Sequence, residues 1–222
     1  MPLILAGRKI ERVGIADNDR YARQSVKSVV EDADLTPLPE KGPLPDLDIF
    51  VKSVMRLADA VICEHRLRHG KYARFDGAEA VARFYKSCFP AVLCTAWAKA
   101  DADTIRKYRP YIPALIPARD ADSDSIVRGI ELCIGEFRNQ FTPGRKPWRT
   151  LVRVEDVDTD SVPALFYVVL PGWNSGEIIR LPLDLIPPTF QDRIRPGIRF
   201  HSLVNKGAES QEELYFDKFE FD

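Results

Sequence analysis

Residues 58–67 of the chain read ADAVICEHRL, a short apolar run that stops at a carboxylate followed by a cluster of charged side chains. A run of this length and β-branched content, with helical patterns on either side, is typical of a strand buried on both faces of a parallel sheet. In open sheets of this kind, functional groups lie just beyond the carboxyl ends of the strands. Glu64 is therefore the first residue that we expect at a functional site.

The composition indicates an ordinary globular protein. The chain has 222 residues, of which 45% are hydrophobic and 29% charged, with a formal net charge of −1, so neither extensive disorder nor broad attraction to nucleic acid or anionic membranes is expected. No apolar run approaches the roughly 20 residues of a membrane-spanning helix, and the first residues are too short for a signal-peptide core. We expect a soluble cytoplasmic protein without a membrane partner.

The cysteines and histidines do not indicate a metal site. The four cysteines show no Cys-x-x-Cys spacing and three lie within or beside apolar runs, so buried, reduced thiols are expected rather than disulfides or zinc ligands. His65 and His69 are four residues apart, but they lack the intervening Glu of a metalloprotease motif. We expect both to be solvated histidines in a loop.

Strand and helix patterns alternate five times in the first part of the chain. Expected strands cover residues 10–16, 36–39, the run that ends at Glu64, 90–94 and 111–116. Expected helices cover residues 20–31, 46–57, 76–87, 101–108 and 122–137. The strand at 36–39 contains two prolines and is at best a short edge strand. This alternation predicts an α/β fold with a doubly wound, five-stranded parallel sheet.

The pattern changes at residues 139–147, NQFTPGRKP, which have the composition of a linker. Beyond them the helical period disappears, and short runs rich in Val, Ile, Phe and Tyr alternate with turn signals. These runs cover residues 150–157, 164–170, 177–181, 199–204 and 213–219. The spacing predicts a small antiparallel β-barrel or sandwich. The expected organisation is an α/β domain over residues 1–138, a linker over 139–147 and a small all-β barrel over 148–222.

Four polar features lie at the expected strand ends and helix starts of residues 12–137. In chain order they are Asp17-Asn18-Asp19 after the first strand, Glu64 ending the third, Asp76-Gly77 opening the next helix, and Thr95-Ala96 ending the fourth strand. In this order they resemble the receiver domain of two-component response regulators, of the CheY-like type. The resemblance covers a little over half of the chain and implies a flavodoxin-like fold.

The resemblance also implies roles for these residues. In that family, acids after the first strand bind Mg²⁺, and an aspartate ending the third strand accepts a phosphoryl group. A hydroxyl residue then reports phosphorylation, and a lysine ending the fifth strand neutralises the added charge. Carried over, Glu64 takes the phosphoacceptor position and Thr95 the switch position, while Asp17, Asp19 and Glu64 would hold Mg²⁺ if the metal is retained.

This sequence departs from the family pattern at the positions that carry the chemistry. Glu64 has one methylene more than the expected aspartate, and a displacement of about 1 Å can slow a reaction by about 100-fold. Asn18 is neutral where the second acid is expected, although Asp19 could replace it. Arg119 is the only cation near the end of the fifth expected strand, where the family has lysine. We therefore expect phosphoryl transfer to be lost.

These departures predict a non-catalytic signalling protein: a pseudo-receiver that has no cofactor other than Mg²⁺ at most and recognises a partner protein. The resemblance implies a bacterial two-component system or phosphorelay, with a kinase-like or effector protein as partner. Two alternatives remain, a phosphorylatable response regulator and a Mg²⁺-dependent phosphatase of the haloacid-dehalogenase type with Asp17 as nucleophile and Asp19 as general acid/base. The simplest structural alternatives are an ion pair between Glu64 and Arg119 or another cation of the pocket, and a Thr95 hydroxyl that only caps the next loop.

The C-terminal domain offers a weaker indication of nucleic-acid binding. Its aromatic residues and arginines could supply stacking and phosphate contacts, but the same segment is rich in acids, so we expect the aromatics to fill a core and the arginines to balance acids. The residues concerned are Trp148, Trp173, Phe190, Phe200, Arg149, Arg153, Arg180, Arg193, Arg195 and Arg199.

Overall fold

The computed structural model describes residues 2–221, and their contacts divide the chain into two compact units. The first unit holds the residues up to 101 together with 111–141. The second holds residues 102–110 together with those from 142 onward. The chain therefore passes between the units at three places, 101/102, 110/111 and 141/142.

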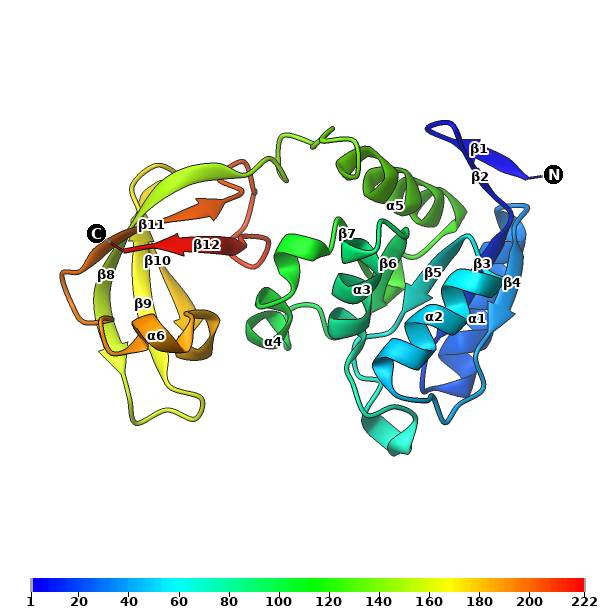
Figure 1. Cartoon of the computed structure of the whole chain (residues 1–222), viewed down its shortest axis with the longest axis horizontal. Helices are drawn as coiled ribbons and strands as arrows, with labels where there is room; N and C mark the ends of the chain where they lie inside the picture. The colour runs from blue at the N-terminus through cyan, green and yellow to red at the C-terminus, as the bar shows by residue number, and fades with distance from the viewer. Residues whose placement is uncertain (1, 222) are drawn as a thin grey trace. The chain divides into compact units, whose positions relative to one another are not determined.

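A five-stranded parallel sheet forms the centre of the first unit (Figure 1). Across the sheet, its strands are β4 (Thr36–Pro39), β3 (Arg12–Ala16), β5 (Ala60–Cys63), β6 (Ala91–Thr95) and β7 (Ala114–Pro117). Numbered along the chain, this order is 2-1-3-4-5, the doubly wound order of flavodoxin-like folds, with its switch point between β3 and β5. The expected α/β fold is confirmed, including the short edge strand at residues 36–39.

Helices cover both faces of this sheet. They are α1 (Arg20–Asp32), α2 (Leu47–Leu57), α3 (Gly77–Lys86) and α5 (Ser123–Glu136). Helices α1 and α5 contact each other on one face, where Val30 and Ile130 pack in the same cluster as Ile62. Helices α2 and α3 lie on the other face, with the rings of Phe50 and Phe84 5.8 Å apart.

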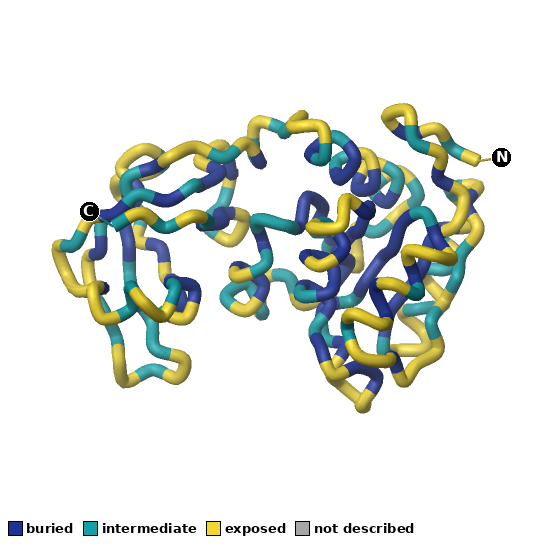
Figure 2. Tube along the Cα trace, viewed as in Figure 1, coloured by how far each residue is buried: buried dark blue, intermediate teal, exposed yellow. Residues whose placement is uncertain are grey.

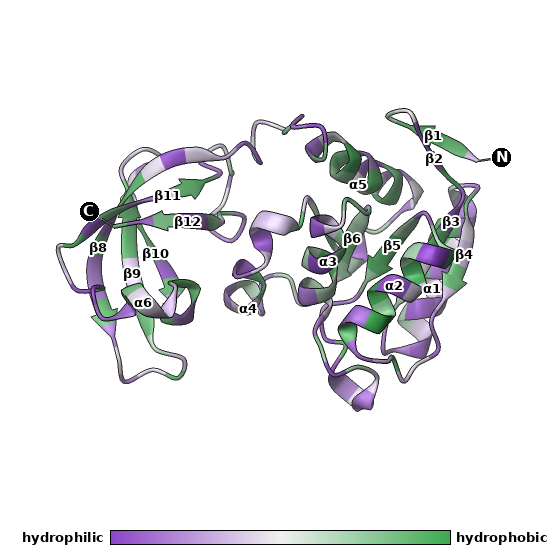
Figure 3. Ribbon diagram, in the orientation of Figure 1, coloured by the Kyte–Doolittle hydropathy of each residue, from purple (hydrophilic) through white to green (hydrophobic). Residues whose placement is uncertain are grey.

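Because helices cover both faces of the parallel sheet, its central strands appear in the sequence as continuous apolar runs. Every residue of β5 and β6 is buried, and both strands are apolar along most of their length (Figures 2 and 3). A strand with no solvent-facing side has no reason to alternate apolar and polar residues.

Two parts of the first unit's sequence fold differently from the expectation. A hairpin of β1 (Leu3–Leu5) and β2 (Arg8–Ile10) precedes the sheet, so Ile10 belongs to the hairpin and not to the first parallel strand. The buried Leu5 and Ile10 extend the core on the side of α1 and α5. Strand β7 begins only at Ala114, because Pro113 before it cannot donate to the ladder.

The second unit is built on a five-stranded antiparallel sheet. Its strands, in order across the sheet, are β10 (Asn174–Pro182), β9 (Leu165–Leu170), β8 (Trp148–Asp158), β11 (Arg199–Val204) and β12 (Phe216–Glu220). A short helix, α6 (Pro188–Gln191), precedes β11. The prediction of a five-stranded antiparallel domain is confirmed. Among residues 2–221 the pairings do not join β10 to β12, so the structure shows a sheet but not its closure into the expected barrel.

Residues 102–110 also belong to this unit, although the sequence pattern places them in the α/β domain. Helix α4 (Ala102–Arg106) is shorter than the expected helix over residues 101–108. Its Arg106 is buried, and Nη1 donates to the carbonyl oxygens of Gln211 and Leu214, both at 2.8 Å. Arg106 therefore holds α4 on the segment that leads into β12.

Most aromatic residues of the second unit contribute to its core, in agreement with the simpler expectation. Phe200 is fully buried, and Trp173 and Phe190 pack against the same cluster, whereas Trp148 is 43% exposed. The arginines are partly balanced by acids, as in the pairs Arg149–Glu220 (2.8 Å), Arg180–Asp103 (2.6 Å) and Arg153–Glu155.

Among residues 2–221 none of the four cysteines forms a disulfide, and three of them are buried, as the sequence predicts. These three are Cys63, Cys94 and Cys133, whereas Cys88 is exposed. Among residues 2–221 no helix has the length and apolar character needed to cross a bilayer.

Candidate functional site

Three neighbouring strand ends bring polar side chains to one edge of the parallel sheet. Ala16 at the end of β3 lies opposite Cys63 at the end of β5, so Asp17 and Glu64 follow at the same level. Thr95 is the last residue of β6, the next strand in the sheet. A cavity of about 550 Å³ opens here, and its lining includes the predicted site residues Asp17, Asn18, Asp19, Glu64 and Arg119.

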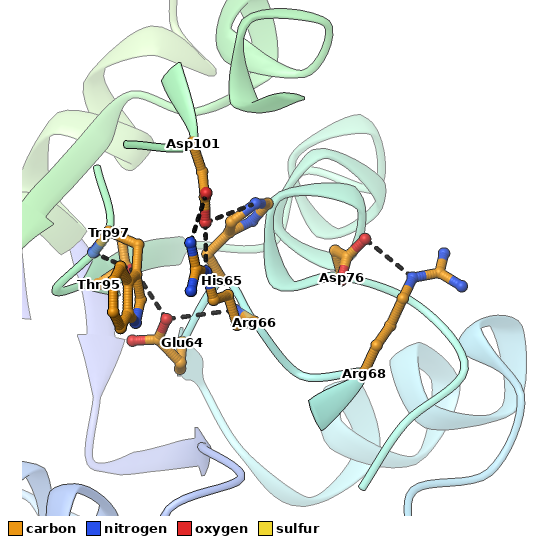
Figure 4. A network of polar contacts seen from close by, with 8 residues as sticks. All are labelled: Glu64, His65, Arg66, Arg68, Asp76, Thr95, Trp97 and Asp101. Carbon is orange, nitrogen blue, oxygen red and sulfur yellow. Dashed lines mark hydrogen bonds and ion pairs between the residues drawn. The ribbon is translucent and has the colours of Figure 1, made fainter. Parts of the chain in front are cut away.

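The side chains of Glu64 and Thr95 are hydrogen-bonded to each other. Thr95 Oγ1 donates to Glu64 Oε1 at 2.6 Å and accepts from the backbone N–H of Trp97 at 3.1 Å (Figure 4). Glu64 Oε1 also accepts from the backbone N–H of Arg66 at 3.2 Å. Hydrogen bonds from a hydroxyl to a carboxylate are shorter and stronger than neutral ones. Because Thr95 is fully buried, this bond is shielded from water.

The structure agrees in part with the simplest alternative for Thr95, a loop cap, but not with an ion pair between Glu64 and Arg119. Thr95 does cap the following loop, through the N–H of Trp97, but it bonds to Glu64 as well. Glu64 forms no ion pair with Arg119 among the residues that the structure describes; Arg119 instead lies 3.5 Å from Asp120, and its side chain is 82% exposed. The alternative in which Glu64 pairs with Arg119 is therefore wrong, because the Arg119 side chain is exposed and lies against Asp120.

Asp17 and Asp19 occupy different environments although they are two residues apart. Asp17 is 5% exposed, and burial, together with the neighbouring charges of Glu64 and Asp19, raises the pKa of its carboxyl to about 6. Asp19 caps α1, its Oδ1 accepting from the backbone N–H groups of Ala22 (2.9 Å) and Tyr21 (2.7 Å), and these bonds lower the pKa of its carboxyl. Both carboxyl groups thus have structural partners.

The carboxylates expected to hold Mg²⁺ are not arranged as a ligand set. Mg²⁺ requires nearly octahedral oxygen ligands at about 2.0–2.1 Å. Asp19 instead caps a helix, Glu64 accepts from Thr95, and Asp17 Oδ1 accepts from the N–H of Asp19 at 2.8 Å. Within residues 2–221 no group of three His, Cys, Asp or Glu side chains could hold an ion. Each of these three carboxylates is thus engaged by a donor within the protein, and Mg²⁺ binding stays a prediction.

Sequence reasoning missed a second group of side chains beside the cavity. Arg66 donates from Nε and Nη2 to the two carboxylate oxygens of Asp101 at 2.7 and 2.8 Å, and its guanidinium lies 3.7 Å from the centre of the Trp97 ring (Figure 4). The bond to Arg66 lowers the pKa of the Asp101 carboxyl. Asp101 therefore connects the loop after β6 to the loop after β5. The two partners are 35 residues apart in the chain, so no local pattern indicates the pair.

His65 is buried, contrary to the expectation of a solvated histidine. It is 3% exposed, and burial lowers its pKa, so the contact of its Nε2 with Asp101 at 3.8 Å involves a neutral ring at physiological pH. The loop after β5 folds back over this position, and the backbone N–H of Gly77 donates to the carbonyl oxygen of His65 at 2.7 Å. His69, by contrast, is exposed and lines the cavity.

Asp76 and Gly77 place the start of α3 against this loop. Asp76 pairs with Arg68, with Nε and Oδ2 2.8 Å apart (Figure 4). A Cβ atom on Gly77 would lie 1.7 Å from the carbonyl oxygen of Glu64, so only glycine fits. The Asp-Gly pair that contributed to the resemblance therefore has a packing role directly beside Glu64.

No family model matches the chain, and no curated protein matches it. Solved structures of similar fold include a response regulator receiver domain protein from Clostridium thermocellum, with 12% identity, a TM-score of 0.44, and coverage of 59% of this chain and 98% of that chain. A receiver protein from Pseudoalteromonas atlantica has 17% identity, a TM-score of 0.38, and coverage of 57% and 98%. An uncharacterized protein from Neptuniibacter caesariensis has 17% identity, a TM-score of 0.43, and coverage of 58% and 93%. The fold of the first unit is assigned from its own strand order.

Proposed function

We propose that this chain is a non-catalytic pseudo-receiver, whose α/β unit presents one fixed arrangement to a partner protein without being phosphorylated. The hydrogen bond from Thr95 Oγ1 to Glu64 Oε1 carries this proposal. In the family that the sequence resembles, the hydroxyl at this position turns toward a phosphoryl oxygen. Here an oxygen of the glutamate side chain accepts that bond, so the hydroxyl already has its acceptor.

The loops around this bond support the same proposal. Arg66 connects to Asp101 through two hydrogen bonds and stacks on Trp97, while Thr95 connects to Glu64. These contacts join the segment that follows β6 to the segment that follows β5. A bidentate bond between arginine and carboxylate fixes orientation as well as distance. The surface made by these loops would therefore keep one conformation for a partner to recognise.

The geometry is unfavourable for both catalytic alternatives, the phosphorylatable response regulator and the phosphatase. In a phosphorylatable receiver the Thr95 hydroxyl would have to leave Glu64 Oε1 to reach a phosphoryl oxygen, and Arg119, the cation expected to neutralise that group, is exposed and lies against Asp120. In the phosphatase alternative, Asp19 would act as general acid/base, but its carboxylate caps α1. Helix α1 also begins at Arg20, which leaves no room for the flap expected after the first strand of such enzymes.

Incubation with acetyl phosphate and Mg²⁺, followed by mass spectrometry of the intact protein, tests this proposal. We expect no phosphoryl adduct, whereas a phosphorylatable receiver treated in parallel should acquire one. A stoichiometric adduct on the peptide that contains Glu64 would contradict the proposal. Hydrolysis of p-nitrophenyl phosphate that is lost in Asp17→Asn would instead favour the phosphatase.

The proposed partner is a protein of the same regulatory system, either kinase-like or an effector. A partner that recognises the fixed loops should bind wild type more tightly than Thr95→Val. Thr150→Val is a matched control, because Thr150 is also buried and donates to a backbone carbonyl, that of Trp148 at 2.9 Å, in the second unit. Equal loss of binding in both variants would contradict recognition through the loops.

A further inference from the structure

Helix α1 separates the cavity beside Asp17, Asp19 and Glu64, called the acidic cavity below, from a second hollow that is lined by basic residues. Asp19, Ala22, Ser25 and Val26 line the acidic cavity. The second hollow, of about 400 Å³, is lined by Arg20, Arg23, Gln24, Lys27, Pro39 and Lys41. Positions three and four residues apart share a helix face, so the two sets of α1 residues lie on different faces. Lys41 follows β4, so the hollow draws its cations from two elements.

The positive charges in this hollow are only partly compensated by acids. Lys27 lies 3.4 Å from Glu31, but neither Arg20 nor Lys41 forms an ion pair with an acid in the part of the chain that the structure describes. Asp19 caps α1 and interacts electrostatically with Arg23, but no acid lies in the first turn itself, where Arg20 and Arg23 oppose the helix dipole. Arg23 and Lys27 are also like charges at i and i+4, which destabilises a helix. A bound anion would offset the repulsion between these cations and their unfavourable interaction with the helix dipole.

One cation of the hollow is held in place before any ligand binds. Arg23 donates from Nη1 to the carbonyl oxygen of Asp17, and its guanidinium carbon lies 5.8 Å from the centre of the Tyr72 ring. Half-buried between these partners, Arg23 still lines the hollow. A prepositioned arginine loses less conformational freedom on binding than a free one.

We propose that this hollow binds a small anion that carries several phosphate groups. Two guanidinium forks and two ammonium groups match multiply charged phosphate oxygens, and Gln24 adds a neutral donor. The volume falls within the range of about 300–1,000 Å³ that is usual for small-molecule sites. Neither a carboxylate nor an aromatic ring is among the lining residues, so charge and not base stacking would select the ligand.

Calorimetric titration of the full chain with inorganic tripolyphosphate at constant ionic strength tests this site. The variant Arg20→Ala/Lys41→Ala removes two charges from the hollow without touching the acidic cavity, and we expect about tenfold weaker binding. The control Lys52→Ala/Lys107→Ala removes two charges from exposed lysines outside the hollow and should bind as wild type does.

Equal affinity in both double variants, or absence of binding to wild type, would overturn the proposal. An oligoglutamate peptide of the same charge that binds as tightly as tripolyphosphate would overturn the preference for phosphate. Amide chemical shifts provide a second readout, and tripolyphosphate should perturb residues 20–27 and 41 before any others. The acetyl phosphate experiment is independent of this site, so either proposal can fail alone.

Discussion

Asp17 is the residue at which the requirements of stability and of a binding site conflict most clearly. Its carboxyl is buried beside Glu64 and Asp19, and burial raises its pKa to about 6. A raised carboxyl pKa means that the folded state disfavours the charged form, so ionised Asp17 destabilises the protein at neutral pH. Carboxyl groups kept in such surroundings are characteristic of functional sites.

Asp17→Asn should therefore stabilise the protein at pH 7. The folded-state pKa lies above the unfolded value, so the wild-type contribution is favourable below about pH 4 and is lost as the pH rises through about 6. We expect a gain of about 1–3 kcal/mol at pH 7 that disappears near pH 4. Urea denaturation across this pH range measures the gain. Asp184→Asn, at an exposed position, is the control, and an equal gain there or a gain independent of pH would contradict the explanation.

Thr95→Val should destabilise the α/β unit and loosen the loop after β6. The substitution leaves Glu64 Oε1 without its hydroxyl donor and the N–H of Trp97 without its acceptor. Loss of a hydrogen bond to a charged group costs about 1.5–3 kcal/mol, whereas Thr150→Val, which loses a bond to a neutral carbonyl, should cost about 1 kcal/mol. Hydrogen exchange should become faster over residues 96–101 in Thr95→Val only. Unchanged protection there would show that the bond does not hold the loop.

The site residues themselves could be predicted from the sequence because strand ends are encoded locally. Asp17, Glu64 and Thr95 each follow or end a short apolar run, and parallel strands bring such ends to one edge. Their partners could not be predicted in the same way. The contact of Arg66 with Asp101 depends on how two loops fold toward each other, and the burial of His65 depends on where α3 begins.

At the scale of the elements, predictions succeeded where periodicity is strong. Strands β5 and β6 are continuous apolar runs, and α1, α2, α3 and α5 have one apolar face, so their type and place were clear from the sequence. The β1–β2 hairpin consists of two three-residue strands, too short for a periodic signal. Helix α4 has only five residues and its Arg106 is buried on the second unit, which no local pattern indicates.

Gly77→Ala should displace the start of α3 from the loop that carries Glu64. The added Cβ would lie 1.7 Å from a backbone oxygen, which cannot move without shifting the end of β5. Overpacking typically costs about 1–3 kcal/mol, and we expect about 3 kcal/mol here because the atom that is met belongs to the backbone. Gly70→Ala is the matched control, because nothing lies within 4 Å of its Cβ and only the positive φ of 63° opposes alanine.

That control should cost about 1–2 kcal/mol, the ordinary penalty for the left-handed region. Thermal unfolding of both variants gives the comparison. The proposed packing role of Gly77 would be wrong if Gly77→Ala were no more destabilising than Gly70→Ala.

At the scale of the whole molecule, the chain is not divided by a single linker. Residues 102–110 follow the loop of the candidate site and belong to the second unit, and the chain then returns to the first unit to form β7 and α5. A cut at residue 141 would thus separate α4 from the carbonyl groups of Gln211 and Leu214 that Arg106 binds.

Arg106→Gln in the full chain should destabilise the second unit selectively. Arg106 is 4% exposed, and glutamine is too short to reach both carbonyl oxygens, so one buried and one partly buried acceptor lose a charged donor. We expect a loss of about 2–3 kcal/mol. Hydrogen exchange should accelerate over residues 102–110 and 205–216 and remain unchanged over α5. Lys107→Gln, which changes the neighbouring exposed residue in the same way, should leave both regions unchanged. Acceleration spread evenly over both units would show instead that the whole chain unfolds as one cooperative body, and that Arg106 contributes to all of it.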